Sequence, residues 1–208
     1  MTGNEFVFNI ILIVIYSLFS IIRIEYYRRA RKAGLKTIVK EDTRYSILLS
    51  ILIVYEVATF FVYLLLPHLM HWAAVELPYV IRWLGAAFGV IALMLFIWVH
   101  SSLGSNFSSR VMIKDQHMLV TNGPYRWIRH PMYTAFFILH IAAFFLTANW
   151  FIGITWITGV TLIITTRIRR EENMMIKRFS NEYLNYMRHT RRFLPLPGFI
   201  KNRNRKSV

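Results

Sequence analysis

Two polar segments, separated by a long apolar run, carry most of the residues that are suited to chemistry in this chain. The first ends in GPYRWIRHPMY at 123–133, which places two arginines, one histidine and two tyrosines within eleven residues. The second begins with RIRREE at 167–172 and places three arginines beside two glutamates. Guanidinium groups bind carboxylates and phosphates, and carboxylates bind cationic groups. The two segments therefore contain the donors and acceptors of a site for a small polar ligand.

The spacing of these residues also predicts how they are presented. A proline disfavours helix at the residue before it and suits the first turn of a helix, so we expect a helix to start near Pro131. Its free N–H groups and partial positive charge would lie beside Arg129 and His130. Arg167 and Glu171 are four residues apart and share a helix face. A basic loop with a helix start, followed by a surface helix with exposed ion pairs, would explain the same pattern without a function.

Five apolar blocks must position these two segments. They cover 6–22, 45–66, 79–100, 132–147 and 150–166. About 20 helical residues cross the hydrocarbon core of a bilayer, and the first three blocks reach that length. The last two are shorter and are separated only by Ala148 and Asn149, which is typical of a tight helical hairpin. We predict an all-α integral membrane protein with about five transmembrane helices.

The same pattern indicates one membrane domain, 1–208. Three N-terminal spans would occupy 1–100, and the loop, the hairpin and a C-terminal helix would occupy 101–195. A basic tail follows at 198–208. An apolar stripe through 167–192 predicts that the C-terminal helix runs on from the fifth span along the membrane surface.

Charge sets the expected orientation. The segments 23–44, 101–131 and 167–208 carry eight, four and twelve of the 25 Lys and Arg residues, and Arg82 is the remaining one. If all five blocks span, these three segments lie on one side, which the positive-inside rule makes cytoplasmic. The N-terminus is then outside, in the plasma membrane of a prokaryote or the endoplasmic reticulum of a eukaryote. Topology and anionic lipids thus explain the net charge of +15 without a nucleic-acid partner.

Several polar residues fall inside or beside the spans. Glu56, His100 and His140 are either functional groups or packing residues. His68 and His71 are spaced for a metal ion, but two ligands are a weak signal, and with no cysteine in the chain we expect no metal site. Gly85 and Gly89 form a G-x-x-x-G pattern, which allows close helix contact within the bundle or between subunits.

Two longer stretches carry a family resemblance. LVTNGPYRWIRHPMY at 119–133 and RIRREENMMIKRFSNEYLNYMRHTRRFLP at 167–195 resemble the isoprenylcysteine carboxyl methyltransferase and phospholipid methyltransferase family. The resemblance covers 108–197, and the two motifs are specific when joined at this spacing. It implies methyl transfer from S-adenosylmethionine by an integral membrane enzyme, with S-adenosylhomocysteine as product. It also implies no soluble Rossmann domain, and the sequence contains no G-x-G-x-x-G.

The resemblance further implies a cytoplasmic cofactor pocket formed by the 108–133 loop and the C-terminal helix. The residues expected to bind the cofactor are His117, Met118, Leu119, Val120, Tyr125, Arg129, His130, Pro131, Met132, Tyr133 and Glu171. Glu171 would bind the methionine end of the cofactor, and Arg167 would lie on the substrate side. Glu172 is a second carboxylate for the same region, so the expected catalytic residues are Arg167, Glu171 and Glu172.

The acceptor implied is an amphiphile, either a lipid or a prenylated cysteine. A carboxylate acceptor needs no base but needs an anchor such as Arg167. An amine, as in phosphatidylethanolamine, would have to lose a proton to Glu172 or a histidine. We favour O-methylation of an isoprenylcysteine-type carboxylate.

Two other classes of protein remain open. Membrane sterol reductases that use NADPH share an RHP-x-Y motif, but theirs usually reads RHP-N-Y with a nearby G-E, whereas this chain reads RHPMYTAF. A transporter or membrane scaffold is the non-enzymatic alternative. Transporters more often show internal repeats, and none is found here.

Overall fold

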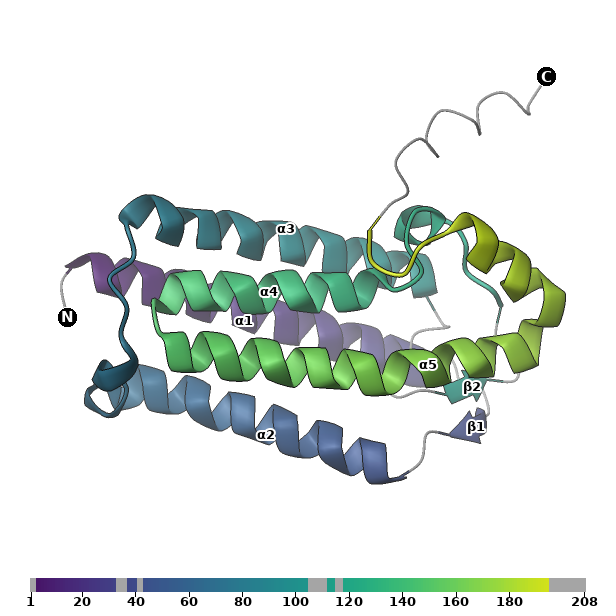
Figure 1. Cartoon of the computed structure of the whole chain (residues 1–208), viewed down its shortest axis with the longest axis horizontal. Coiled ribbons are helices and arrows are strands. Elements are labelled where there is room, and N and C mark those ends of the chain that lie inside the picture. Colours follow the sequence, from purple (N-terminus) through teal and green to yellow (C-terminus); the bar gives the residue numbers. More distant parts are fainter. Residues whose placement is uncertain (1–2, 33–36, 41–42, 105–111, 115–117, 195–208) are drawn as a thin grey trace, which may run out of the picture.

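The structure is a computed structural model that describes residues 3–32, 37–40, 43–104, 112–114 and 118–194. Five helices lie side by side as a bundle (Figure 1): α1 (Gly3–Lys32), α2 (Thr43–Leu65), α3 (Tyr79–Leu103), α4 (Pro131–Thr147) and α5 (Trp150–His189). Four of them are long and apolar enough to cross a membrane, and α4 is a shorter apolar helix. The predicted all-α membrane fold is confirmed.

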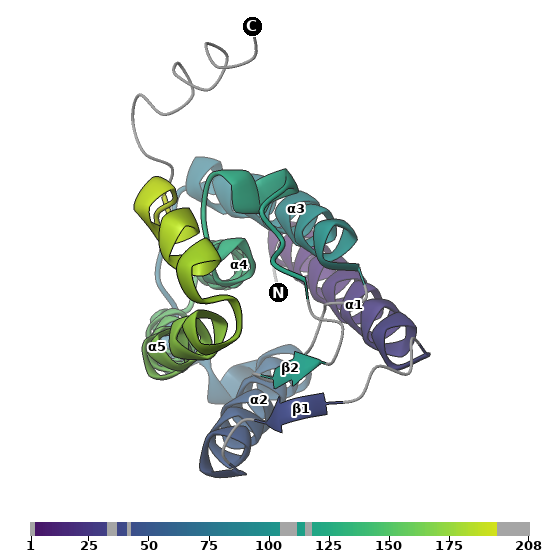
Figure 2. The same cartoon turned by 90° about the vertical axis from the view of Figure 1, so that its right-hand side faces the viewer.

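Short elements close the two ends of the bundle. The 3-10 turns η1 (Pro67–Leu69) and η2 (His71–Ala73) connect α2 to α3 at one end. At the other end, β1 (Thr37–Lys40) pairs antiparallel with β2 (Met112–Lys114), a small sheet that the sequence did not lead us to expect (Figure 2). A further 3-10 turn, η4 (Gly123–Arg126), precedes α4.

The α4–α5 hairpin turns within two residues, as predicted. Ala148 adopts the left-handed conformation with φ 46°, and its N–H bonds the Phe144 carbonyl to end α4. Asn149 then caps α5, because its side-chain oxygen accepts from the Ile152 N–H at 3.1 Å. Its amide group donates to the Met70 carbonyl at 3.0 Å and ties the hairpin turn to the η1–η2 connection.

Close packing of α1, α3 and α4 forms the centre of the bundle. One face of α1, spaced at three and four residues, is buried and comprises Phe8, Leu12, Ile15 and Phe19. On α3, a Cβ at Gly85 would lie 2.7 Å from the Cβ of Phe145, and one at Gly89 would lie 2.3 Å from Ile15 Cδ1. The G-x-x-x-G pattern therefore serves contacts inside the bundle.

The buried charge of Arg82, at the η1–η2 end, is paired. Arg82 is buried, forms an ion pair with Glu5, donates to the Leu146 carbonyl at 2.7 Å, and lies 4.2 Å above the Phe8 ring. His100 is buried with its Nδ1 2.9 Å from the Phe96 carbonyl oxygen, which is a packing arrangement.

Helix α2 is packed far more loosely than its neighbours. Only 6% of its apolar window is buried, against 28–44% for the other three long helices. Three polar contacts connect α2 to the other helices. Tyr63 donates to Asn9 at 3.1 Å, and Trp156 donates to Thr59 at 2.8 Å. Glu56 lies 3.2 Å from His140 Nε2. A cavity of about 600 Å³ is lined by residues of α1, α2, α4 and α5.

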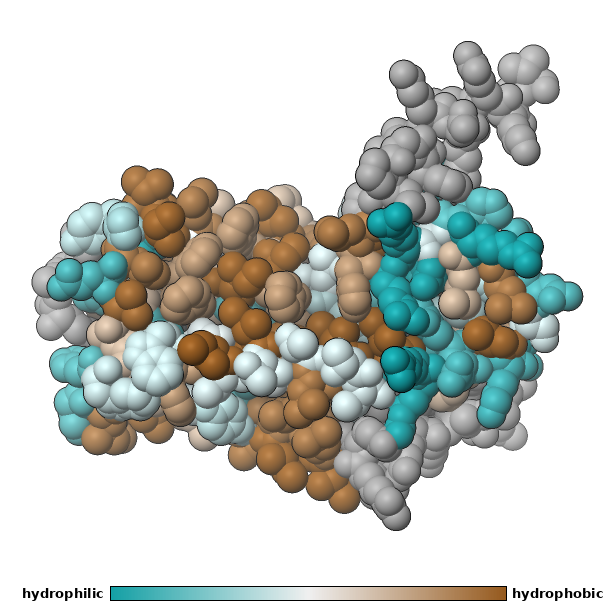
Figure 3. Space-filling view, in the orientation of Figure 1, coloured by the Kyte–Doolittle hydropathy of each residue, from teal (hydrophilic) through white to brown (hydrophobic). Residues whose placement is uncertain are grey.

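The surface of the bundle is divided by polarity (Figure 3). Hydrophobic residues cover the helices over most of their length, and hydrophilic residues gather over the second half of α5. We call this region the polar end of the bundle; it comprises η4, the start of α4 and residues 167–194.

We predict that Gly85→Ala lowers the stability of the protein and that Gly159→Ala does not. Both replacements gain about 1 kcal/mol of helix propensity. At Gly85 the new methyl group would also lie 3.2 Å from backbone atoms of Ala142 and Leu146, an overpacking that costs about 1–3 kcal/mol. At Gly159 the nearest atoms are 3.8 Å away. Thermal unfolding in detergent checks the pair, and an equal or higher melting temperature for Gly85→Ala would show that α3 and α4 are further apart.

Candidate functional site

Helix α5 carries the second polar segment out of the apolar layer and back onto the first. The residues of α5 before Ser180 extend about 45 Å, which exceeds the roughly 30 Å of hydrocarbon in a bilayer, so the part after residue 166 continues beyond the span. The predicted continuation of the fifth span into a C-terminal helix is confirmed. Ser180, with φ 45° and ψ −119°, kinks the helix, and the last turns fold back toward the start of α4 (Figure 1).

Glu172 is the centre of the polar end. Its side chain is only 5% exposed, and three side chains surround its carboxylate. Arg129 donates from Nε and Nη2 at 3.1 and 3.0 Å, and Arg192 donates from Nη2 at 2.6 Å. His130 Nε2 lies 3.3 Å from the same carboxylate. Both oxygens of Glu172 are therefore engaged within the protein.

The chain after α5 runs alongside the residues before α4. The Arg129 and His130 N–H groups donate to the carbonyls of Arg191 and Arg192 at 2.7 and 3.0 Å. The Arg129 guanidinium also donates to the Met187 and Thr190 carbonyls. These bonds fix the backbone at the start of α4 and orient the two side chains there.

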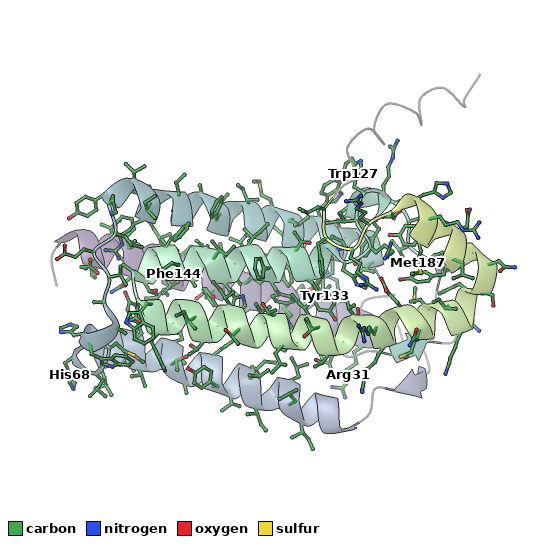
Figure 4. The ribbon with its side chains drawn as sticks, viewed as in Figure 1. Arg31, His68, Trp127, Tyr133, Phe144 and Met187 are labelled. Carbon is green, nitrogen blue, oxygen red and sulfur yellow. The ribbon has the colours of Figure 1, made fainter. Side chains whose placement is uncertain are left out.

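The neighbouring carboxylate, Glu171, has a different environment. Its side chain is 26% exposed, and it accepts a hydrogen bond from the Tyr133 hydroxyl at 2.5 Å. His130 Nδ1 lies 3.5 Å from its other oxygen, so the imidazole is placed between Glu171 and Glu172. Figure 4 shows Tyr133 at the start of α4, facing the part of α5 that carries these glutamates. Glu171 is thus oriented by two groups and keeps an accessible side.

The charges of the polar end follow from this geometry. Burial by itself would raise the pKa of Glu172, but hydrogen bonds from His130, Arg192 and Arg129 bring that pKa well below its ordinary value. Burial alone would lower the pKa of His130, and the hydrogen bonds with the two glutamates outweigh it and raise that pKa. Burial, with the charge of Glu171, raises the pKa of the Tyr125 hydroxyl. The site therefore holds the Glu172 carboxylate in its charged form beside the neutral phenol of Tyr125.

The other residues predicted to bind a cofactor differ in their exposure. Pro131 is buried; Leu119, Val120, Tyr125 and Met132 are half-buried; Met118 is 71% exposed. Tyr125 is held through its carbonyl, which accepts from the Tyr186 hydroxyl at 2.7 Å. Arg167 is buried on α5, one helical turn before Glu171. His117 lies outside the described residues.

One residue of the site was missed from the sequence. Arg192 supplies the shortest bond to Glu172, yet it lies 20 residues away and beyond the kink at Ser180. A cluster of basic residues after the C-terminal helix was the available signal, and it does not tell which of them returns to the glutamate.

Fold and site together define a multi-pass membrane protein with a polar site built by a helical hairpin and the helix that continues from it. The model of the isoprenylcysteine carboxyl methyltransferase (ICMT) family matches residues 84–177. That segment contains the first motif and the start of the second, and the family resemblance predicted from the sequence is confirmed.

Curated relatives agree with this match. The protein-S-isoprenylcysteine O-methyltransferase of Homo sapiens is 36% identical over 100 residues, 47% of this chain and 34% of that protein. The enzyme of the same name from Dictyostelium discoideum is 32% identical over 108 residues, 50% of this chain and 45% of that protein. The matched part thus spans less than half the length of these relatives.

A solved structure shows the same fold. The eukaryotic intramembrane Ras methyltransferase ICMT superposes with a TM-score of 0.52 at 23% identity, over 76% of this chain and 55% of that chain.

We predict that Glu172→Gln destabilises the protein at neutral pH and flattens its acid denaturation. The pKa of Glu172 is lowered in the folded state, so its contribution is present above the unfolded-state pKa, about 4.3, and is lost as pH falls through the folded value. Between about pH 3 and 5, His130 is protonated in both states and adds no slope. Removing the charge leaves two arginines around a neutral amide, which lowers the free energy of unfolding by about 3 kcal/mol.

Melting temperatures measured from pH 3 to 8 check this expectation. Glu182→Gln is the matched control, because Glu182 is exposed on the same helix. If the melting temperature of Glu172→Gln falls with acid as steeply as that of the wild type, the Glu172 carboxylate is not the acid-sensitive group.

Proposed function

We propose that this protein is an integral membrane methyltransferase that uses S-adenosylmethionine to methylate a lipid-like acceptor at the cytoplasmic face. The preferred acceptor is a carboxylate of the isoprenylcysteine type. The observation that carries the proposal is the state of Glu171: a partly exposed carboxylate, oriented by Tyr133 and His130, one helical turn from the buried Arg167. The similarity to proteins named protein-S-isoprenylcysteine O-methyltransferase supports it.

The residues present fit a cofactor with a cationic end. Glu171 has an accessible side for an ammonium group, whereas Glu172 already has three partners. Tyr125 lies within electrostatic range of Glu171, and we expect the half-buried Leu119, Val120 and Met132 to add apolar walls. When bound, S-adenosylmethionine supplies a methyl group that is already activated by the positive sulfur.

The task of the protein is then to hold the partners in line and to exclude water. Glu171 would bind the methionine end of the cofactor, and Arg167 would bind the acceptor carboxylate with paired hydrogen bonds. A carboxylate oxygen takes the methyl group without giving up a proton, so no general base is needed. Glu172 and Arg129 act as positioning residues, because their bonds fix His130 and the start of α4.

The acceptor tail has a matching site within the spans. The cavity beside α2 is lined mainly by apolar and aromatic side chains, including Phe60, Phe61, Phe136, Leu139 and Trp156. Phe136 lines the cavity and lies one helical turn from Tyr133 on α4, so this side of the cavity is near the polar end. An aliphatic tail in the cavity would place its polar head near Arg167, and the loosely packed α2 would let it enter from the lipid.

We predict that the purified protein binds S-adenosylhomocysteine with micromolar affinity and that Glu171→Ala abolishes this binding with the fold intact. The ammonium group of the ligand would lose its only proposed counter-charge. Isothermal titration calorimetry in detergent measures it, with Glu182→Ala as the control for a lost negative charge on the same helix.

NADPH is the comparison ligand in that experiment. Binding of NADPH without S-adenosylhomocysteine would favour the reductase alternative. Binding of neither by a folded protein would favour the scaffold.

We predict that the η1–η2 end faces outward and the polar end faces the cytoplasm, because 24 of the 25 Lys and Arg residues fall in segments on one side. The chain has no cysteine, so each single-cysteine variant has one labelling site. With the protein expressed in the plasma membrane of a bacterium, His71→Cys should react with an impermeant maleimide in intact cells, and Arg188→Cys only after permeabilisation. The reverse pattern would invert the proposed topology, and the cysteine-free protein is the control.

A further inference from the structure

Arg23 occupies an unusual place for a basic residue at the end of a span. Its side chain is half-buried and lies on the same face of α1 as the buried Phe8, Leu12, Ile15 and Phe19, since it follows Phe19 by four residues. Arginines at span ends usually extend to the headgroups, and further along α1 Arg28 and Arg29 are exposed. Arg23 instead lines the cavity, with its guanidinium carbon 5.3 Å from the Phe136 ring centroid.

This position lies between the cavity and the candidate cofactor site. Phe136 packs against the cluster of Tyr133, Val160, Ile164 and Ile168, which flanks Arg167 on α5. Tyr133 in turn donates to Glu171. A tail that fills the cavity must therefore pass Arg23 before its head reaches Arg167 and Glu171.

The charges that face Arg23 favour an anion at this point. Arg167, Glu56 and Tyr133 lie within electrostatic range of its guanidinium. Two guanidinium groups in one poorly solvated region repel each other. Glu56 is directed to His140, 3.2 Å from its Nε2. A carboxylate between the two arginines would accept hydrogen bonds from both, whereas an ammonium head would meet two like charges.

We infer that Arg23 is a second acceptor-binding arginine, which works with Arg167 to hold the anionic head of the acceptor and to discriminate against cationic heads. This inference rests on the proposed function and extends it to α1, outside the segment matched by the family model. Arg23 would contact the head group of the acceptor and would have no part in binding the cofactor.

The test is methyl transfer from labelled S-adenosylmethionine to N-acetyl-S-farnesylcysteine, measured for four proteins. Arg23→Gln should raise the KM for this acceptor about tenfold or more, the effect of losing hydrogen bonds to a charged group, with a smaller change in kcat. Binding of S-adenosylhomocysteine should stay at the wild-type value. Arg23→Lys, which keeps the charge but loses the paired geometry, should recover part of the loss. Arg28→Gln, an exposed neighbour on α1, should behave as wild type.

Other outcomes separate this inference from the proposed function. An unchanged KM in Arg23→Gln, with active wild-type protein, overturns the role of Arg23 alone. If the wild-type protein methylates phosphatidylethanolamine faster than the carboxylate, the inferred preference for an anionic head is overturned. No methyl transfer by the wild-type protein to either acceptor overturns both proposals. If Arg23→Gln melts well below wild type, its KM says little, and Arg23→Lys becomes the test of the role of Arg23. A raised KM in Arg23→Lys with a normal melting temperature supports that role, and a normal KM overturns it.

Discussion

A buried carboxylate at the polar end of the bundle is the constraint on which the site depends. Burying the charge of Glu172 is costly unless charged and hydrogen-bonding partners surround it. Arg129, His130 and Arg192 meet that requirement from two separate segments. They can do so only if the chain kinks at Ser180 and returns to the start of α4. The ion-pair cluster therefore holds together the hairpin, the C-terminal helix and the residues after it.

Two adjacent glutamates then take different roles because a helix rotates by about 100° per residue. Glu172 faces the arginines and is enclosed by them. Glu171 faces Tyr133 and retains an accessible side. His130 contacts both carboxylates and so couples the packing of the polar end to the group proposed to bind the cofactor. Glu172 thus stabilises the polar end, and its neighbour Glu171 is the residue proposed to bind the cofactor.

The spans show a second division, between tight and loose packing. Small residues let α3 approach α1 and α4 closely, as at Gly85 and Gly89, which suits helices that gain little from apolar burial within lipid. Helix α2 is held by a few polar bonds, among them Glu56 with His140, and leaves a cavity beside it. A tightly packed half that carries the polar site and a loosely packed helix that borders the lipid suit the methyl transfer to an amphiphile that is proposed above.

Hydrophobic length, proline and local motifs act over short distances, so the sequence alone predicted the helical spans, the tight hairpin, the helix start at Pro131, the continuation of α5 and the family resemblance. It also identified Glu171 as the carboxylate expected to bind the cofactor and Glu172 as a second carboxylate, but it did not show that Glu172 is enclosed by arginines. The tertiary structure alone decided that Arg192 returns to Glu172, that Arg23 turns inward, and that β1 pairs with β2. These features depend on a single kink and on which residue of a periodic face meets a neighbour, and many positions in the sequence satisfy such rules equally well.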